Sequence, residues 1–341
     1  MLNRQQKIFP INTVVLIPLF IIFCFIFTIP NAFAKTPQQD VAKLPMSETQ
    51  VRQSLTQTLK TFQQVYVFPD KAKQVSDTML MNLEKGKYKG IKTRKEFAET
   101  FTQELKILTT DRHLSVNLVE DTSKTPTHIG THEEDYLKNN FALERLEILK
   151  GNVGYIKLNK FYSDEEARPV VDAAFTFLER SDAIIIDLRE CIGGSPELVR
   201  YIVSFFVEED IHLWSIIDKH GTETYQAKSS KTEGRPVLKK DTPLYILTSS
   251  GTASAAEVFT YTLKHLKRAT VVGEKTFGIA YLVGSERIND MFDGRFSMVR
   301  PYNPITKSDW ELKGVLPHYS VTAQESLGKT LTLISEQQKN N

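Results

Sequence analysis

Hydroxyl side chains gather between Ser249 and Glu257, where the sequence predicts that a helix begins. Four residues carry them: Ser249, Ser250, Thr252 and Ser254. A serine at a helix start has free backbone N–H groups around it and lies at the positive end of the helix dipole, and both favour a developing anion. Acyl transfer by a nucleophilic serine requires this arrangement. Because Ser254-Ala255-Ala256-Glu257 also has the form of a capping box, this stretch alone favours a simple helix cap.

A pair of glycines, Gly193-Gly194, lies between an apolar run and a second expected helix. The pair is explained either as a flexible turn or as a place where a backbone N–H points at a substrate with no side chain in the way. Ligands of open α/β sheets bind at the carboxyl ends of strands, so we expect a site at the loops that leave Ile186 and Leu247. The glycines lie in the first loop and the hydroxyl cluster in the second.

A nucleophilic serine also needs a base. The chain offers seven histidines: His113, His128, His132, His212, His220, His265 and His318. His113 lies where a helix gives way to a strand, on the face of that strand opposite Leu114 and Val116. A structural role is the default for any one histidine, so position alone does not choose the base.

Three amphipathic helices are expected in the first third of the chain. The first follows a capping box at 47–50, the second runs over about 70–83, and the third follows a box at 93–96. Apolar and polar residues then alternate over 114–118, as in a half-buried strand. Residues 120–150 are polar and weakly patterned.

Strands and helices alternate from residue 153 onward. The expected order is strand 153–158, helix 163–179, strand 183–187, helix to 207, strand 212–218 with a hairpin turn at 220–221 into 224–225, strand 244–247, helix 254–266 and strand 269–272. The unbroken run Ile184-Ile185-Ile186 is typical of a strand that is covered on both faces. Repeated strand–loop–helix units predict an α/β fold with a mainly parallel sheet.

The first 34 residues have the pattern of a secretory signal peptide. Arg4 and Lys7 precede an apolar stretch over 14–29, and Ala32-Phe33-Ala34 offers a cleavage site. An uncleaved membrane anchor is the alternative, but the small residues before the expected cut favour cleavage. We therefore expect an exported chain, periplasmic or secreted, with no membrane span after cleavage.

Composition narrows the class of protein further. The 341 residues include 16 Gly and 14 Pro, and 25% of them are charged, so a collagen-like or wholly disordered chain is excluded. The charges are balanced, with 43 Lys+Arg and 41 Asp+Glu, and give no reason to expect nucleic acid as a partner. Signal cleavage would remove Cys24 and leave Cys191 alone, so no internal disulfide is expected. We interpret Cys191 as a small core residue rather than a nucleophile.

Five motifs occur in the order found in a known family. They are Asp111-Arg112-His113-Leu114-Ser115-Val116; Ile185-Ile186-Asp187-Leu188-Arg189 leading to Gly193-Gly194; Thr252-Ala253-Ser254-Ala255-Ala256-Glu257; Val271-Val272-Gly273-Glu274-Lys275-Thr276-x-Gly278; and Glu311-x-x-Gly314-Val315-x-Pro317. Over about residues 47–325 the chain resembles the tail-specific, or C-terminal processing, serine peptidases. The most similar branch contains interphotoreceptor retinoid-binding protein modules and Tricorn-type core peptidases.

The resemblance implies a crotonase/ClpP-like core after a small three-helix N-terminal domain. It also implies a protein or peptide substrate, with no cofactor and no metal. Ser254 would be the nucleophile. The oxyanion hole would be formed by the backbone N–H of Ala255 together with that of Gly193 or Gly194.

Two departures from the family pattern bear on the mechanism. The processing peptidases usually carry a PDZ module, for which 120–150 is too short, and a catalytic lysine, whose position Ile279 occupies here. The Tricorn-like branch uses Ser, His and a carboxylate, and His113 and Glu311 stand at the matching motifs. A carboxylate behind the imidazole would fix its tautomer. Glu257 is interpreted as a capping partner, with a second orienting carboxylate as the alternative.

The expected organisation is a signal peptide at 1–34, a linker at 35–46, a helical domain at 47–118, a peptidase core at 119–325 and a tail at 326–341. The leading hypothesis is an exported serine endopeptidase with the triad Ser254, His113 and Glu311. A non-catalytic binding module for apolar ligands is the alternative, because a fold can outlive its chemistry. An envelope-attached scaffold is a third class, which requires an uncut leader.

Overall fold

The computed structural model describes residues 40–119, 138–162, 164–230, 238 and 241–340. All of them belong to one compact unit, Asp40–Asn341. The expected signal peptide, the first part of the expected linker and most of the weakly patterned connector lie outside the described residues. Within those residues, no helix combines the length and the apolar character needed to cross a bilayer.

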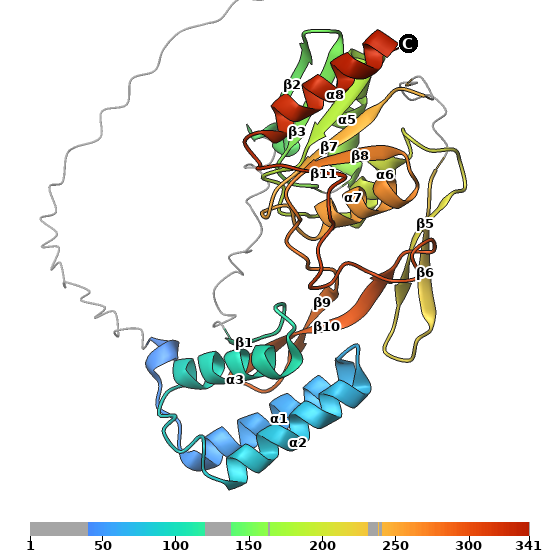
Figure 1. The fold of residues 1–341 in the computed structure, drawn as a ribbon. Helices are drawn as coiled ribbons and strands as arrows, with labels where there is room; N and C mark the ends of the chain where they lie inside the picture. Colours follow the sequence, from blue (N-terminus) through green and yellow to red (C-terminus); the bar gives the residue numbers. More distant parts are fainter. Residues whose placement is uncertain (1–39, 120–137, 163, 231–237, 239–240, 341) are drawn as a thin grey trace, which may run out of the picture. The chain divides into compact units, whose positions relative to one another are not determined.

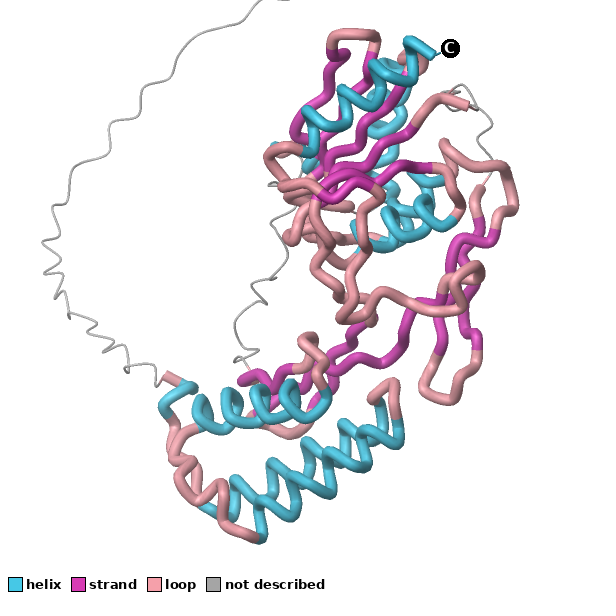
Figure 2. Tube along the Cα trace, viewed as in Figure 1, coloured by secondary structure: helices cyan, strands magenta, loops and turns pink. Residues whose placement is uncertain are grey.

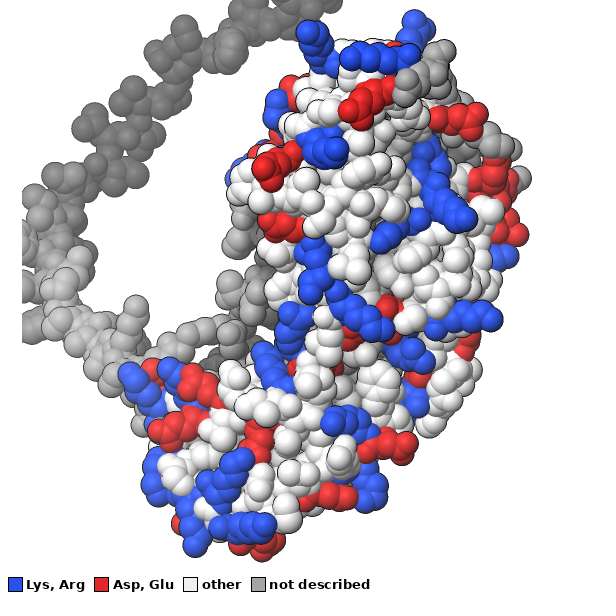
Figure 3. Space-filling view, viewed as in Figure 1, with Lys and Arg blue, Asp and Glu red and all other residues white. Residues whose placement is uncertain are grey.

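Three helices form the N-terminal part, as the sequence predicts. After a short 3-10 helix (η1, Val41–Lys43) they are α1 (Glu48–Val65), α2 (Pro69–Glu84) and α3 (Arg94–Thr109) (Figure 1). The Ser47 and Thr93 side chains accept from the backbone N–H groups of Gln50 and Glu96, whose side chains bond back, so both expected capping boxes are confirmed. On the surface of these helices Lys and Arg are interspersed with Asp and Glu (Figure 3). Some of them form ion pairs within one helix, such as Nζ of Lys73 with Oδ2 of Asp77 at 2.7 Å.

The core of this helical part is completed by a strand from the C-terminal half of the chain. Strand β10 (Phe292–Tyr302) pairs antiparallel with β1 (Ser115–Leu118). Phe292 stacks on Phe97 of α3 with ring centroids 4.4 Å apart, and Phe296 lies in the same apolar cluster. The sequence predicts a domain boundary after residue 118. Residues on both sides of that position contribute to this one apolar core.

A six-stranded sheet carries the expected α/β pattern. Its order is β11 (Tyr319–Ser320), β8 (Ala269–Gly273), β7 (Leu244–Thr248), β4 (Ala183–Asp187), β3 (Val153–Leu158) and β2 (Leu143–Leu149). Every neighbouring pair is parallel except β2–β3, so the expected mainly parallel sheet is confirmed. The edge strand β2 was not expected, because it lies in the weakly patterned connector and much of it is exposed.

Helices cover both faces of this sheet. One face packs against α5 (Asp164–Leu178), α6 (Pro196–Val203) and α7 (Ala255–His265), and the other against α8 (Ser326–Asn340). Ile184 and Ile186 of β4 belong to the first apolar cluster, whereas Ile185 belongs to the second together with Ile334 of α8. The unbroken apolar run in β4 follows from this double cover. The segment assigned above to a tail thus forms a packed helix.

Of a second, antiparallel sheet, only the hairpin of β5 (His212–Ile217) and β6 (Glu223–Lys228) was expected from the sequence. The order of this sheet is β1–β10–β5–β6, with β9 (Leu282–Arg287) also paired to β10. Figure 2 shows β10 as a long strand that runs between the helical part and the hairpin of β5 and β6. This sheet ties the helical part to the rest of the unit.

Candidate active site

The turn between β7 and α7 places Ser254 in a strained backbone conformation. Its φ is 55° and its ψ is −121°, a region that costs a residue with a side chain about 1–3 kcal/mol. The turn lies beside the glycine loop because β4 and β7 are parallel neighbours whose carboxyl ends meet at one edge. The Ala253 N–H donates to the Cys191 carbonyl at 3.0 Å and fastens the two loops together.

The helix cap at this turn uses the backbone of Ser254 and not its side chain. The Ser254 N–H donates to Oε2 of Glu257 at 3.0 Å, which is one half of the expected capping box. The Ser254 side chain faces the Glu257 backbone as in the other half, so the expected capping box is present, but the Ser254 hydroxyl makes no side-chain cap hydrogen bond. The hydroxyl is thus left without a hydrogen bond to a described group.

The glycine loop packs directly against this serine. A Cβ on Gly193 would lie 2.7 Å from the Ser254 Cβ and 2.9 Å from the Ala255 nitrogen, so no larger residue fits there. Gly193 has a φ of 103° and Gly194 a φ of 131°, both disfavoured for residues with side chains. The backbone N–H groups of Ala255 and Gly194 make no hydrogen bond to another described group, whereas that of Gly193 donates to the Cys191 sulfur. Two of the three donors named from the sequence are therefore unengaged.

Cys191 lies inside the protein beneath this loop. Its side chain is fully buried in the apolar cluster of the sheet and helices. Burial raises the pKa of the thiol to about 12, so the thiol stays protonated at neutral pH. The position and protonation of Cys191 fit the small core residue expected from the sequence.

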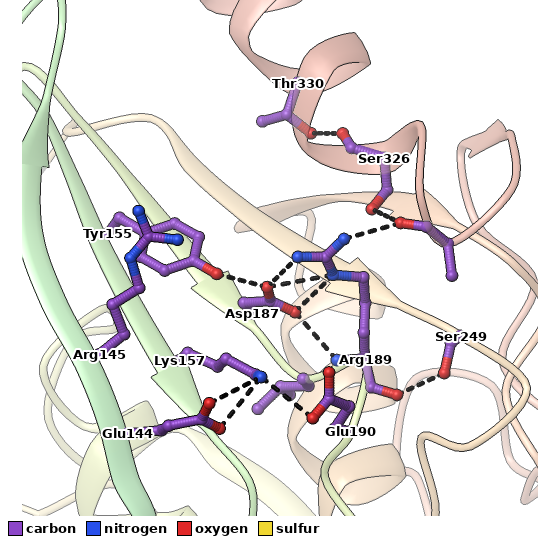
Figure 4. Close-up of polar contacts among 12 residues, drawn as sticks. Glu144, Arg145, Tyr155, Lys157, Asp187, Arg189, Glu190, Ser249, Ser326 and Thr330 are labelled. Atoms are coloured by element: carbon purple, nitrogen blue, oxygen red, sulfur yellow. Dashed lines mark hydrogen bonds and ion pairs between the residues drawn. The ribbon is translucent and has the colours of Figure 1, made fainter.

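The start of the glycine loop is fixed by a buried ion pair (Figure 4). Asp187, at the end of β4, accepts hydrogen bonds from the Tyr155 hydroxyl at 2.5 Å and from Nε of Arg189 at 2.9 Å. Nη1 of Arg189 reaches across to the Ala323 carbonyl at 2.8 Å. Burial alone would raise the pKa of Asp187, but the hydrogen bonds from Arg189 and Tyr155 outweigh it and lower that pKa. An ionised Asp187 thus anchors the loop.

His113 is held by a carboxylate two residues before it. Its ring Nδ1 lies 2.9 Å from Oδ1 of Asp111, which also accepts from the His113 backbone N–H at 2.9 Å. Burial opposes ionisation of Asp111, but the hydrogen bonds from His113 and Ser297 outweigh it and lower the pKa of Asp111. An ionised Asp111 can only accept, so Nδ1 of His113 carries a proton, and in the neutral ring Nε2 is then the acceptor.

Glu311 lies in the same cluster but contacts other groups. One polar atom each of Asp111, His113 and Glu311 lie within 4.8 Å of one another. Oε2 of Glu311 accepts from the Ala280 N–H at 2.5 Å, whereas its Oε1 is buried and has no described hydrogen-bond partner. Burial raises the pKa of Glu311. The structure thus brings His113 and Glu311 together and adds Asp111, which sequence analysis did not put forward.

Residues 276–281 connect the serine turn to this cluster. Oε1 of the buried Glu257 accepts from the Thr276 hydroxyl at 2.5 Å and the Gly278 N–H at 2.7 Å. Arg112 donates to the Gly278 carbonyl at 2.7 Å. Glu257 is therefore an anchor of this segment as well as a capping partner, and burial raises its pKa. Across the described ranges, no hydrogen bond joins the Ser254 hydroxyl to His113.

Three of the other histidines have evident structural contacts. Nε2 of His212 lies 2.8 Å from the Ser215 hydroxyl, Nδ1 of His318 accepts from the Val271 N–H at 2.9 Å, and the ring of His265 packs on Tyr261. His220 lies in the turn between β5 and β6, away from the cluster. His128 and His132 lie outside the described residues. Among the described histidines, only His113 belongs to a cluster with two carboxylates.

A serine turn, a glycine loop and a histidine–carboxylate cluster on this fold define the class of serine peptidases of family S41. The model of "Peptidase family S41" matches residues 152–321, and the model "N-terminal domain of Peptidase_S41 in eukaryotic IRBP" matches residues 39–144. Together the two matches include both loops, Ser254, His113 and Glu311. The chain belongs to peptidase family S41.

Curated relatives agree with this family, and a solved structure shares the fold. The chain is 31% identical over 170 residues to "Carboxyl-terminal-processing peptidase 2, chloroplastic" of Arabidopsis thaliana, with 49% of this chain and 31% of that protein covered. It is 27% identical over 195 residues to "Carboxyl-terminal-processing protease" of a Picosynechococcus species, with 57% and 45% covered. The chain therefore matches less than half the length of these relatives. A putative peptidase of Parabacteroides merdae shares the fold with a TM-score of 0.58 at 19% identity, over 83% of this chain and 96% of that one.

Proposed function

We propose that the chain is a serine peptidase that cleaves protein or peptide substrates through an acyl-enzyme. The observation that carries the proposal is the conformation of Ser254. A serine with a φ of 55° at a helix start costs conformational energy, yet its hydroxyl makes none of the capping bonds that would explain a serine there. A strained strand-to-helix turn that leaves a serine oxygen available is typical of a nucleophile.

The groups around Ser254 match the needs of acyl transfer. The hydroxyl oxygen attacks the scissile carbonyl, and the backbone N–H of Ala255 with that of Gly193 or Gly194 donates to the oxyanion. Because the N–H groups of Ala255 and Gly194 make no other described hydrogen bond, they need not break one to serve the substrate, whereas the N–H of Gly193 also contacts the Cys191 sulfur. Nε2 of His113 accepts the serine proton and then passes it to the leaving amine, after which water releases the acyl group.

The carboxylates have separate parts in this proposal. Asp111 keeps the His113 ring in the tautomer that leaves Nε2 as the acceptor, and its charge stabilises the imidazolium. Glu311, the carboxylate of the sequence hypothesis, lies within the same 4.8 Å cluster and adds a second negative charge when it is ionised. Ser254 and His113 share no described hydrogen bond, so the proposal requires that they approach one another when substrate binds.

Export is a further part of the proposal, and it rests on the sequence pattern of residues 1–34. Expression of the full chain, followed by mass determination of its mature N-terminus, tests this part by itself. A chain that starts at Lys35 supports cleavage after Ala34. A mature chain that still contains residues 1–34 contradicts it, and leaves the peptidase proposal untouched.

A fluorophosphonate probe tests the peptidase proposal directly, since it reacts with activated serines. The wild-type protein should be labelled, and Ser254→Ala should not. Ser250→Ala is the matched control, because this neighbouring serine is exposed and its substitution should leave labelling intact. Hydrolysis of an unfolded protein such as casein should follow the same pattern. A folded wild-type chain that is neither labelled nor active would favour the binding-module alternative.

A further inference from the structure

We propose that Asp111, His113 and Glu311 form a binding site for a divalent transition-metal ion of the Zn²⁺ type, and that this ion reversibly blocks the peptidase. The blocking effect rests on the proposed function, whereas the binding itself does not. Each residue offers one ligand atom, and these atoms lie within 4.8 Å of one another. An imidazole nitrogen with two carboxylate oxygens is a donor set that suits Zn²⁺ or Co²⁺ and is poor for Ca²⁺ or Mg²⁺.

A buried, unpartnered oxygen in this cluster points to a cation. Oε1 of Glu311 is buried and has no hydrogen-bond partner within the described residues. Oδ2 of Asp111 is also buried and lacks a well-aligned donor, although the hydroxyls of Ser297 and Tyr66 lie beside the Asp111 carboxylate. Asp111 is 3% exposed and Glu311 6% exposed. Buried acceptors without donors are unfavourable, and each one in a native fold calls for an explanation. A cation bound to Oε1 of Glu311 would satisfy that oxygen.

Two other buried carboxylates of the unit, those of Asp187 and Glu257, have hydrogen-bond donors at both oxygens. Both oxygens of Asp187 accept hydrogen bonds, from Tyr155 and Arg189. Both oxygens of Glu257 do so as well, from the segment 276–279 and from Ser254. Neither Asp111 nor Glu311 forms an ion pair with a described Lys or Arg. The cluster therefore contains carboxylate oxygens that could accept further hydrogen bonds or bind a cation, and the described residues do not use them fully.

The metal would enter where the ring proton of His113 now lies. Nδ1 of His113 and Oδ1 of Asp111 are 2.9 Å apart, close to the roughly 3.3 Å between ligands of tetrahedral Zn²⁺. The ligand oxygen of Glu311 lies within 4.8 Å of the ligand atoms of His113 and Asp111, and it must move closer to them to bind the same ion. Three protein ligands leave a fourth position for water, as in open zinc sites.

This mode of binding explains why the ion would inhibit. When the metal occupies Nδ1, the single proton of the neutral imidazole moves to Nε2. His113 then has no lone pair to accept the proton of Ser254, and the nucleophile cannot be activated. A carboxyl group at Glu311, if protonated, releases its proton to solvent as it binds. The exchange involves no oxidation or reduction.

Metal titration of the metal-free full chain tests the site without any need for activity. Co²⁺ should give visible absorption that saturates at one equivalent, and Zn²⁺ should displace it, in the wild type and in Ser254→Ala alike. Glu311→Gln and His113→Asn should each weaken metal binding by at least about tenfold. Removal of a residue that only hydrogen-bonds to a metal ligand already lowers metal affinity by about this factor, so removal of a ligand should cost no less. His212→Asn is the matched control and should bind as the wild type does, because His212 has structural partners elsewhere.

The outcomes separate this inference from the proposed function. If Ser254→Ala binds one equivalent of metal and the metal-free wild type is not labelled by the probe, the metal site is supported and the peptidase proposal is overturned. Labelling of the wild type that persists when Zn²⁺ saturates the protein would overturn the inhibition. No binding by the wild type up to about 1 mM metal, the weak end of specific association, would overturn the site. Equal binding by wild type, Glu311→Gln and His113→Asn, with unchanged circular dichroism, would do the same.

Discussion

The ring of His113 is hydrogen-bonded to Asp111, with Nδ1 and Oδ1 2.9 Å apart, although the two residues are only two positions apart in the chain. The same Asp111 oxygen accepts from the His113 backbone N–H, so a single carboxylate fixes both the backbone and the ring. Glu311 makes no hydrogen bond to this ring and is held by the backbone at Ala280. The orientation of the proposed base thus depends on Asp111.

Asp111→Asn should leave the protein folded and greatly reduce peptidase activity. The amide can donate to Nδ1, which favours the tautomer that has its proton on Nε2 and so cannot accept the proton of Ser254. We expect kcat to fall on the order of 10³- to 10⁴-fold, as for the corresponding change in Ser-His-Asp enzymes. Glu311→Gln, measured beside it, should cost less, since Glu311 makes no hydrogen bond to the ring. A larger loss in Glu311→Gln than in Asp111→Asn would reverse these two assignments.

Glu257→Gln should destabilise the protein and reduce activity together. The side chain accepts four hydrogen bonds, from Ser254, Thr276, Gly278 and Ile279. A glutamine would turn its NH₂ group toward some of these donors, and we expect a loss of about 1–3 kcal/mol in the free energy of unfolding. Urea unfolding measures this loss.

Glu274→Gln is the control for this change. Glu274 also accepts from two backbone N–H groups, those of Ser250 and Ala323, but it lies nearer the surface. Its substitution should reduce stability less than Glu257→Gln and leave probe labelling of Ser254 intact. Equal effects of the two changes would show that the segment 276–279 does not depend on Glu257 in particular.

Local patterns were sufficient to predict the parallel sheet. The apolar runs over 153–158 and 183–187 coincide with β3 and β4, and the boxes at 47–50 and 93–96 start α1 and α3. These elements are determined by neighbours in the chain. The rest of the antiparallel sheet beyond the β5–β6 hairpin was missed because its key pairing joins β1 to β10, far apart in sequence, and no local period encodes that partner.

The proposed site shows the same limit. Gly193 was predicted to be a site residue because it is a glycine in a loop that follows a strand. It lies beside Ser254, as expected when the loops at the carboxyl ends of two neighbouring parallel strands meet. Asp111 could have been found, because an Asp two residues before a backbone N–H is a common turn residue that accepts from that N–H. Its bond to the His113 ring is a matter of three-dimensional geometry. The roles of Ser254, His113 and Glu311 stay predictions until the variants are measured.

Stability should depend on pH through Asp187. Its pKa in the folded protein is lowered, so it contributes stability above its unfolded pKa of about 3.9. That contribution is lost as the pH falls through the folded value. Asp187→Asn should therefore cost about 3 kcal/mol at neutral pH, because it leaves Arg189 without its buried partner. The difference between wild type and variant should shrink below pH 4, which thermal unfolding across pH measures.

Asp218→Asn is the comparison for this pH dependence. The pKa of Asp218 is also lowered, mainly by the backbone N–H of Thr222, but the group is fully exposed at a turn. Solvent screens its interactions, so its substitution should alter the stability profile little. If Asp187→Asn gave an equally flat profile, the ion pair with Arg189 would not be what anchors the glycine loop.

Gly193→Ala should abolish probe labelling of Ser254 at a modest cost in stability. The new methyl group would lie 2.7 Å from the Ser254 Cβ, so either the glycine loop or the serine turn must shift. The φ of 103° adds strain of about 1–3 kcal/mol. Gly221→Ala separates the two effects, because Gly221 has a φ of 78° but open space around its Cβ position. It should lose similar stability and keep full labelling. Normal labelling of Gly193→Ala would mean that this loop does not form the oxyanion hole.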